Sequence, residues 1–150
     1  MNCFPDTSFL CAIYRQQDNS AAAAVLFQAL REPLPVSALL LYEFRQSTRL
    51  QMWLHGQNPR KGFPQPEGQQ ALADLEADLT SGVVTVFPVD WTEVHRVAER
   101  LSAAHTPAEG HRALDVLHVA TALVLKAEVF LTFDANQRKL ATAEGLKVKP

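Results

Sequence analysis

The sequence has little of what marks secreted, membrane-bound or disulfide-rich proteins. Its 150 residues include only two cysteines, Cys3 and Cys11, without the C-x-x-C spacing of a redox or zinc motif. We interpret both as reduced side chains of the core. No apolar run approaches the ~20 residues that span a bilayer, and the N-terminus lacks the basic start and small-residue cleavage site of a signal peptide. We therefore expect a cytoplasmic protein with no membrane partner.

A strong charge of one sign is also missing, because the formal net charge is only -2. Proteins that coat nucleic acid rely on Lys and Arg to neutralise phosphates, so this balance disfavours such a role. It does not exclude a nuclease, since acids gathered around cations would leave the rest of the surface slightly positive. The length and a hydrophobic content of 47% suit one globular domain with its own core, residues 1–150.

The chain does contain a regular alternation of short apolar runs and longer amphipathic segments. The short runs predict strands at Asn2 to Phe4, Leu34 to Val36, Val83 to Phe87, Val129 to Phe133 and Leu146 to Val148. Helices are expected from Asp6-Thr7-Ser8 onward and at Ala21 to Leu30, Ala38 to Leu54, Glu67 to Thr80, Asp90 to His105, Ala113 to Lys126 and Asp134 to Glu144. Strands that alternate with helices imply right-handed crossovers and a parallel sheet covered on both faces. The fold class predicted is a three-layer α/β/α domain.

Polar residues and glycine or proline clusters predict how these elements begin and end. Ser20 and Ser37 are expected to cap the helices that follow them. The segment Thr106 to Gly110 is expected to break a helix, and Gly82 to close one. A stretch rich in Gly, Pro, Gln and basic residues, His55 to Pro66, predicts a long exposed loop.

Four acidic residues stand where an acid is unexpected. Asp6 and Asp134 each follow a predicted strand, and in open α/β sheets the carboxyl ends of the strands form the ligand crevice. Glu43 and Asp115 interrupt apolar helical runs, where an ionised carboxylate needs a compensating partner. Taken singly, each acid can be a cap, a solvated residue or half of an ion pair. The nearest cation in sequence is Arg45 for Glu43 and Arg112 for Asp115, and Arg112 lies one turn before Asp115.

Taken together, the four carboxylates favour a metal site. Carboxylates that converge on one crevice repel one another, and a hard divalent cation with oxygen ligands relieves that repulsion. Mg²⁺ prefers octahedral oxygen coordination, and Mn²⁺ accepts the same ligands. Such a cation lowers the pKa of a bound water and stabilises the charge that develops when a phosphodiester is hydrolysed. The products would be a 5′-phosphate and a free 3′-hydroxyl.

Stretches around these acids carry a resemblance to a known family: Asp6-Thr7-Ser8-Phe9-Leu10, Tyr42-Glu43, Leu114-Asp115-Val116-Leu117-His118-Val119-Ala120-Thr121-Ala122 and Phe130-Leu131-Thr132-Phe133-Asp134. In this order and at these spacings the chain resembles PIN domains over nearly its whole length. The resemblance implies a metal-dependent RNA-cleaving site with four ligands for Mg²⁺ or Mn²⁺, namely Asp6, Glu43, Asp115 and Asp134. It implies supporting hydroxyls at Ser8 and Thr132. Stand-alone PIN domains of this length are similar to VapC-type toxins, which implies an RNA substrate, an antitoxin partner and a homodimer.

Other residues near the motifs have a functional and an ordinary interpretation. The cations expected to contact RNA phosphates, unless they form a solvated face, are Arg112, Arg138 and Lys139. His118 lies one turn after Asp115, but Mg²⁺ and Mn²⁺ favour oxygen, so we interpret it as a packed or hydrogen-bonded helix residue. Phe63, in the long loop, is a candidate for stacking on a base.

Two alternatives stay open at this point. A PIN-like module that binds RNA or protein without cutting would share the fold, and loss of one acid would favour it; here all four positions are filled. A phosphotransfer domain with Asp6 as nucleophile is a different enzyme class. Haloacid-dehalogenase-like phosphatases need a second Asp two residues later, where this chain has Ser8.

Overall fold

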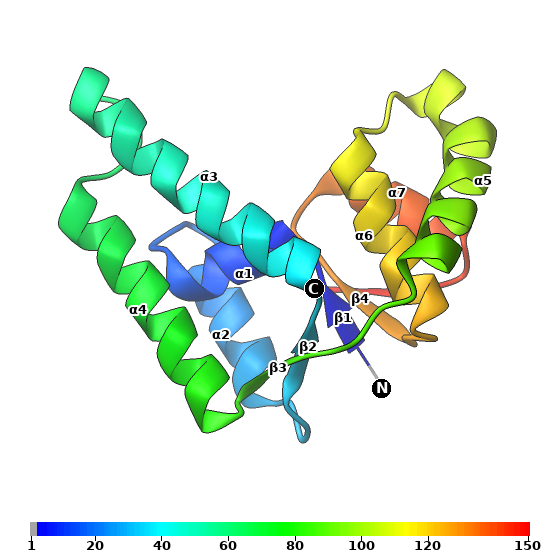
Figure 1. Cartoon of the computed structure of the whole chain (residues 1–150), viewed down its shortest axis with the longest axis horizontal. Helices are drawn as coiled ribbons and strands as arrows, with labels where there is room; N and C mark the ends of the chain where they lie inside the picture. Colours follow the sequence, from blue (N-terminus) through cyan, green and yellow to red (C-terminus); the bar gives the residue numbers. More distant parts are fainter. Residues whose placement is uncertain (1–2) are drawn as a thin grey trace. The chain divides into compact units, whose positions relative to one another are not determined.

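The computed structural model describes residues 3–150, and all its strand pairings are parallel. The strands are β1 (Cys3–Pro5), β2 (Leu34–Val36), β3 (Val84–Val86), β4 (Val129–Leu131) and β5 (Lys147–Lys149). The helices are α1 (Thr7–Tyr14), α2 (Ser20–Gln28), α3 (Ala38–Gln57), α4 (Gln65–Ser81), α5 (Trp91–Glu109), α6 (Ala113–Val124) and α7 (Ala135–Ala143) (Figure 1). The fold is of the predicted three-layer α/β/α class. Asn2, at the start of the first expected strand, lies outside the described residues.

The chain forms two compact units. The first comprises Met1–Phe9 and Phe87–Pro150, and the second comprises Leu10–Val86. The first unit therefore holds β1, β4 and β5 with α5, α6 and α7, and the second holds α2, α3 and α4 with β2 and β3. The chain passes from the first unit to the second within α1 and returns after β3.

In the first unit, the strand order β1-β4-β5 sets two strand ends side by side. Phe4 stands opposite Phe130 in this sheet, and both rings are fully buried. The last paired residues are Pro5 and Leu131, and the amide of Asp6 donates to the carbonyl of Leu131 at 3.0 Å. Because the strands are parallel, the residues that follow β1 and β4 emerge at the same edge of the sheet.

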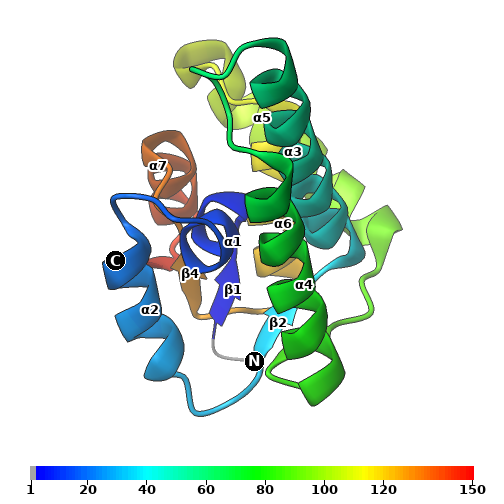
Figure 2. The ribbon, with the colours of Figure 1, turned by 90° about the vertical axis from the view of Figure 1, so that its left-hand side faces the viewer.

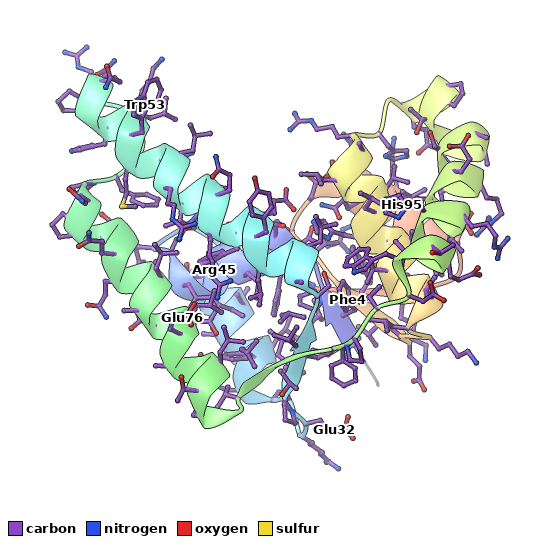
Figure 3. All side chains as sticks on the ribbon, in the orientation of Figure 1. Phe4, Glu32, Arg45, Trp53, Glu76 and His95 are labelled. Carbon is purple, nitrogen blue, oxygen red and sulfur yellow. The ribbon has the colours of Figure 1, made fainter. Side chains whose placement is uncertain are left out.

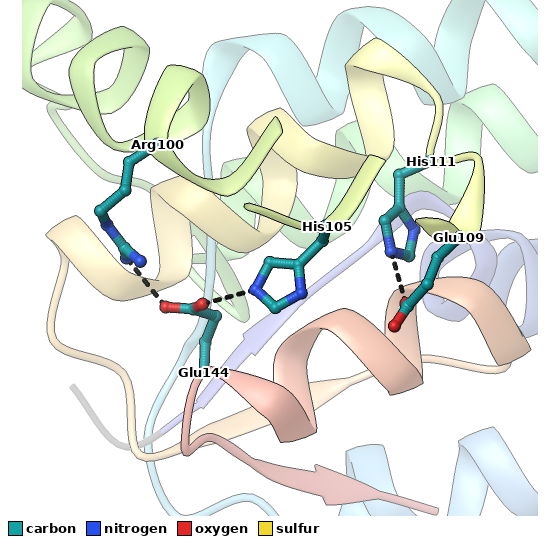
Figure 4. Close-up of polar contacts among 5 residues, drawn as sticks. All are labelled: Arg100, His105, Glu109, His111 and Glu144. Atoms are coloured by element: carbon teal, nitrogen blue, oxygen red, sulfur yellow. Dashed lines mark hydrogen bonds and ion pairs between the residues drawn. The ribbon is translucent and has the colours of Figure 1, made fainter. Parts of the chain in front are cut away.

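Helix α5 packs along α6 in the first unit (Figure 1). It buries Val94, Val97 and Leu101, which share one face at helical spacing. A polar cluster ties α5 to the end of α7: Glu144 binds Arg100 and His105, each at 2.8 Å (Figure 4). The hydrogen bond from Arg100, helped by the one with His105, lowers the pKa of the Glu144 carboxyl.

The second unit contains the β2-β3 pair and a hairpin of α3 and α4, which lie side by side (Figures 1 and 2). Arg45 of α3 pairs with Glu76 of α4 at 2.5 Å (Figure 3). The guanidinium of Arg15 lies 5.6 Å from the ring centroid of Phe63. Phe63 is therefore half-buried in contact with this cation.

The loop between α3 and α4 is shorter than expected. The predicted loop was His55 to Pro66, whereas α3 continues to Gln57 and α4 begins at Gln65, which leaves residues 58–64. At the other end of α4, Gly82 adopts the left-handed conformation expected of a helix C-cap.

Two other predicted boundaries were wrong. The helix expected to break at Thr106 continues as α5 to Glu109 with Pro107 inside it, and Gly110, in the left-handed conformation, closes it by donating its amide to the carbonyl of Thr106. Ser37 caps α3 as predicted, by accepting from the amide of Leu40 at 3.1 Å. Ser20 instead is the first residue of α2, and its hydroxyl donates to the carbonyl of Arg15.

The structure of residues 3–150 can be compared with the expectations about membrane-spanning helices and about the state of the two cysteines. No helix within residues 3–150 is long and apolar enough to cross a bilayer. Cys11 is buried and Cys3 half-buried, and both are thiols.

Candidate functional site

Asp6 is fully buried where β1 gives way to α1, and three donors hold its carboxylate. The hydroxyl of Ser8 donates to Oδ1 at 2.6 Å, and the hydroxyl of Thr132 donates to Oδ2 at 2.5 Å. The amide of Phe9 adds a third bond, to Oδ1, at 3.0 Å. Ser8 and Thr132, the two supporting hydroxyls that the family resemblance implies, thus both donate to Asp6.

Burial raises the pKa of the Asp6 carboxyl from 3.8 to about 6. The hydrogen bonds from Ser8, Thr132 and Phe9, and the charge of His118, act in the opposite direction but do not cancel the loss of hydration. An ionised Asp6 is therefore undercompensated by the chain alone, and a neighbouring cation would stabilise it.

The hydroxyls of Ser8 and Thr132 also accept hydrogen bonds from the backbone. The amide of Phe133 donates to Ser8, and the amide of Asp134 donates to Thr132, both at 2.9 Å. Because each hydroxyl has its single proton directed at Asp6, these backbone donors fix the direction in which the protons point. The segment after β4 therefore orients the carboxylate after β1.

Asp134 and Asp115 are joined through Gln137. Asp134 caps α7 by accepting from the amide of Gln137 at 2.8 Å. The side-chain Nε2 of Gln137 donates to Oδ1 of Asp115, on α6, at 3.2 Å. Hydrogen bonds thus connect three of the four predicted acids within the first unit, in the order Asp6, Thr132, Asp134, Gln137 and Asp115.

His118 is fully buried on α6 beside this network. Its Nε2 lies 3.4 Å from the hydroxyl of Thr7, the first residue of α1. This agrees with the interpretation of His118 as a packed, hydrogen-bonded residue.

The remaining candidates lie in different settings. Glu43 is half-buried on α3, in the second unit. In the first unit, Arg112 and Lys139 are exposed. Arg138 is half-buried, and its Nη2 donates to the carbonyl of Pro150 at 2.7 Å and to that of Thr132 at 3.4 Å.

The donors of this network fit a hard divalent cation by their chemistry. In the part of the chain that the structure describes, no three His, Cys, Asp or Glu side chains are grouped closely enough to enclose an ion. Mg²⁺ does not need such an enclosure, since it keeps several waters and is usually bound through one or two carboxylates. Carboxylate and hydroxyl oxygens are the donors present, and the undercompensated charge of Asp6 is what a cation would neutralise.

The residue that sequence reasoning missed is Gln137. One signal was available, because Asp134-x-x-Gln137 has the spacing of a capping box at the start of a helix. That motif concerns a helix end, however, and does not indicate a contact with Asp115 from another helix.

Comparisons with known proteins identify the family and the fold. The family model described as PIN domain matches residues 3–143. VapC20 of Mycobacterium tuberculosis, a sarcin-ricin loop cleaving toxin, is 21% identical with a TM-score of 0.68, over 99% of this chain and 100% of that chain. FitAcB of Neisseria gonorrhoeae is 19% identical with a TM-score of 0.67, over 99% of this chain and 96% of that one.

A third similar structure is VapBC2 of Rickettsia felis, bound to a DNA fragment from its promoter. It is 12% identical with a TM-score of 0.67, over 99% of this chain and 98% of that chain. At these identities the structures show a shared fold. No curated protein sequence gives a significant match. The family model, in contrast, matches nearly the whole chain, and the protein therefore belongs to the PIN domain family.

Proposed function

We propose that this protein is a metal-dependent endoribonuclease, the toxin of a toxin–antitoxin pair, acting in the cytoplasm. The observation that carries the proposal is the buried Asp6 carboxylate, which three donors hold and which hydrogen bonds link to Asp134 and Asp115. A buried carboxylate with a raised pKa and a fixed orientation is typical of a functional site rather than of a structural core.

The proposed ligands of Mg²⁺ or Mn²⁺ are Asp6, Glu43, Asp115 and Asp134. When bound, the cation would lower the pKa of a water molecule and supply positive charge to the phosphodiester under attack. The residues of the chain contribute position. Ser8 and Thr132 hold the Asp6 carboxylate in one orientation. The Asp134 carboxylate is fixed by the helix cap, and the backbone amide of Asp134 donates to the hydroxyl of Thr132.

Cations on the same unit are proposed to contact the RNA backbone. Arg112 and Lys139 are exposed and near the acidic motifs in sequence, so their charges can reach phosphates. Arg138 is the weaker candidate, because its guanidinium already bonds two backbone carbonyls.

An antitoxin partner and a homodimer complete the proposal. The antitoxin is supported by the likeness to FitAcB and VapBC2, and RNA cleavage by the likeness to VapC20. A surface for a second copy is available on α3, where the large side chains of Tyr42, Leu50 and Trp53 are exposed. Exposed apolar groups gathered on one helix are typical of interaction surfaces.

The test is RNA cleavage by the purified chain in EDTA, Mg²⁺ and Mn²⁺, with structured and unstructured RNAs. The variants are Asp6→Asn and Asp115→Asn, and Asp18→Asn is the matched control because Asp18 is an exposed loop residue. We expect cleavage that leaves 5′-phosphates, needs the metal, falls by at least about 100-fold in both site variants and is unchanged in the control.

Two outcomes contradict the proposal. Full cleavage in EDTA or in the site variants would show that the four acids do not perform the chemistry. Metal and RNA binding without cleavage of any RNA would identify the chain as a binding module of the same fold.

A further inference from the structure

Gln137 contacts two of the proposed metal ligands from one position. It is the third residue of α7 and is only 4% exposed. Its backbone amide donates to Oδ1 of Asp134 at 2.8 Å, and its side-chain Nε2 donates to Oδ1 of Asp115 at 3.2 Å. A single buried residue therefore joins a carboxylate after β4 to a carboxylate on α6.

Gln137 does not follow the behaviour that its sequence position predicts. In a capping box, the side chain of the Gln at this position turns back to the amide of the capping residue. Here that amide, of Asp134, donates to the hydroxyl of Thr132 at 2.9 Å. The side chain of Gln137 is thereby released from the cap and reaches Asp115 instead.

The contact with Asp115 fixes the orientation of the Gln137 amide group. An ionised carboxylate only accepts, so the amide must present Nε2 to it and turn Oε1 away. Within residues 3–150, Oε1 of Gln137 is buried and has no hydrogen-bond partner. An apolar side chain would avoid that unfavourable burial, so the position is not optimised for packing.

We propose that Gln137 is a positioning residue of the metal site, which holds the Asp115 carboxylate in a fixed orientation relative to Asp134. This inference rests on the proposed function, because it takes both acids as ligands. Groups that hydrogen-bond to metal ligands fix the ligand geometry, and their loss weakens metal binding by about 10–100-fold. Gln137 acts through Asp115.

The test is a double-mutant cycle read out by Mn²⁺ affinity without RNA. The full-length variants are Gln137→Met, Asp115→Asn and the combination, titrated with Mn²⁺ by calorimetry. Gln70→Met is the matched control, because Gln70 donates to Asp74 at 2.8 Å on the exposed surface of α4. A cooperative unfolding transition in EDTA shows that each variant is folded, and steady-state kinetics of RNA cleavage give kcat and KM separately.

We expect Gln137→Met to weaken Mn²⁺ binding by about 10–100-fold and to lower kcat with little change in KM. In the Asp115→Asn background the same change should have no further effect, and Gln70→Met should bind Mn²⁺ like the wild type. An unaltered affinity in Gln137→Met, or an undiminished effect in the Asp115→Asn background, would overturn the inference while leaving the proposed function intact. Wild-type protein that binds no Mn²⁺ would overturn both.

A second measurement does not depend on a folded variant. In wild-type protein titrated with Mg²⁺, the side-chain amide resonances of Gln137 should shift and saturate with the binding curve, and those of Gln70 should not. A Gln137 resonance that stays in place while Mg²⁺ binds would overturn the inference as well.

Discussion

Replacing Asp6 by asparagine should make the metal-free protein more stable at neutral pH. The carboxylate is fully buried and its pKa is raised to about 6, so keeping it ionised opposes folding. Asparagine has nearly the same shape and no charge. Its oxygen can still accept from Ser8 and Phe9, and its nitrogen can donate to the hydroxyl of Thr132 once that hydroxyl rotates.

The size of the effect follows from the pKa of Asp6. The native state holds the proton more tightly than the unfolded state, whose pKa is near 3.8, so unfolding releases a proton between about pH 4 and 6. Stability therefore falls as the pH rises through this window. Two pKa units correspond to about 3 kcal/mol. Rearranged hydrogen bonds in the variant cost about 1 kcal/mol, which leaves a net gain of about 2 kcal/mol above pH 7.

Urea unfolding in EDTA between pH 4.5 and 8 measures this gain. Trp91 lies in the first unit and Trp53 in the second, so a Trp53→Phe background makes fluorescence report on the unit that contains Asp6. The Asp18→Asn variant serves as the control. The difference in stability between Asp6→Asn and wild type should grow as the pH rises from 4.5 to 7 and stay constant above pH 7. A variant that is less stable than wild type by the same amount at every pH would refute the reasoning.

Glu144→Gln should destabilise the first unit by about 1–2 kcal/mol at pH 7, because it removes the charge that binds Arg100 and His105. The pKa of Glu144 is lowered in the folded state, so this contribution exists above the unfolded pKa and is lost as the pH falls. Urea unfolding should therefore show a difference in stability between wild type and Glu144→Gln at pH 7 but not at pH 3.5. Equal differences at both pH values would contradict this prediction. Gly62→Ala should destabilise the second unit by about 2 kcal/mol or more, because φ is +59° and a Cβ would lie 2.0 Å from the carbonyl oxygen of Gln51. Gly56→Ala, where a Cβ meets nothing within 4 Å, is the control and should be neutral or slightly stabilising in the same thermal unfolding experiment.

The sequence predicted the elements well where one local cause decides them. The apolar run from Val129 is short and contains β-branched and aromatic residues, which suit a buried strand. Ser37 caps its helix because the cap involves only residues three positions apart. The positions of Asp6 and Asp134 after strands followed from the same local patterns.

Predictions that depended on competition between residues were less successful. The segment Thr106 to Gly110 was expected to break a helix, but α5 continues through Pro107 and ends where Gly110 adopts φ +71°. Ser20 could cap α2 by its type and position. Its hydroxyl instead accepts from Gln17 and donates to Arg15, which local spacing does not reveal.

The contact of Gln137 with Asp115 was beyond sequence reasoning for a related reason. Whether the glutamine turns back to its own helix depends on whether the amide of Asp134 is available, and Thr132 takes that amide. Thr132 in turn is held by Asp6, which is 126 residues away in the chain. The position of a buried side chain in α7 is thus decided by an acid at the end of β1, and only the folded chain brings the two together.

Two carboxylates of the first unit act on its stability in opposite directions as the pH changes. Glu144 stabilises the fold once it is ionised, because Arg100 and His105 compensate it. Asp6 destabilises the fold once it is ionised, because neutral donors and the charge of His118 do not make up for its lost hydration. An acid retained only for folding would resemble Glu144. Because Asp6 is held rigidly by three donors and still lacks a full counter-charge, its environment is the one expected of a group whose partner is an ion from outside the chain.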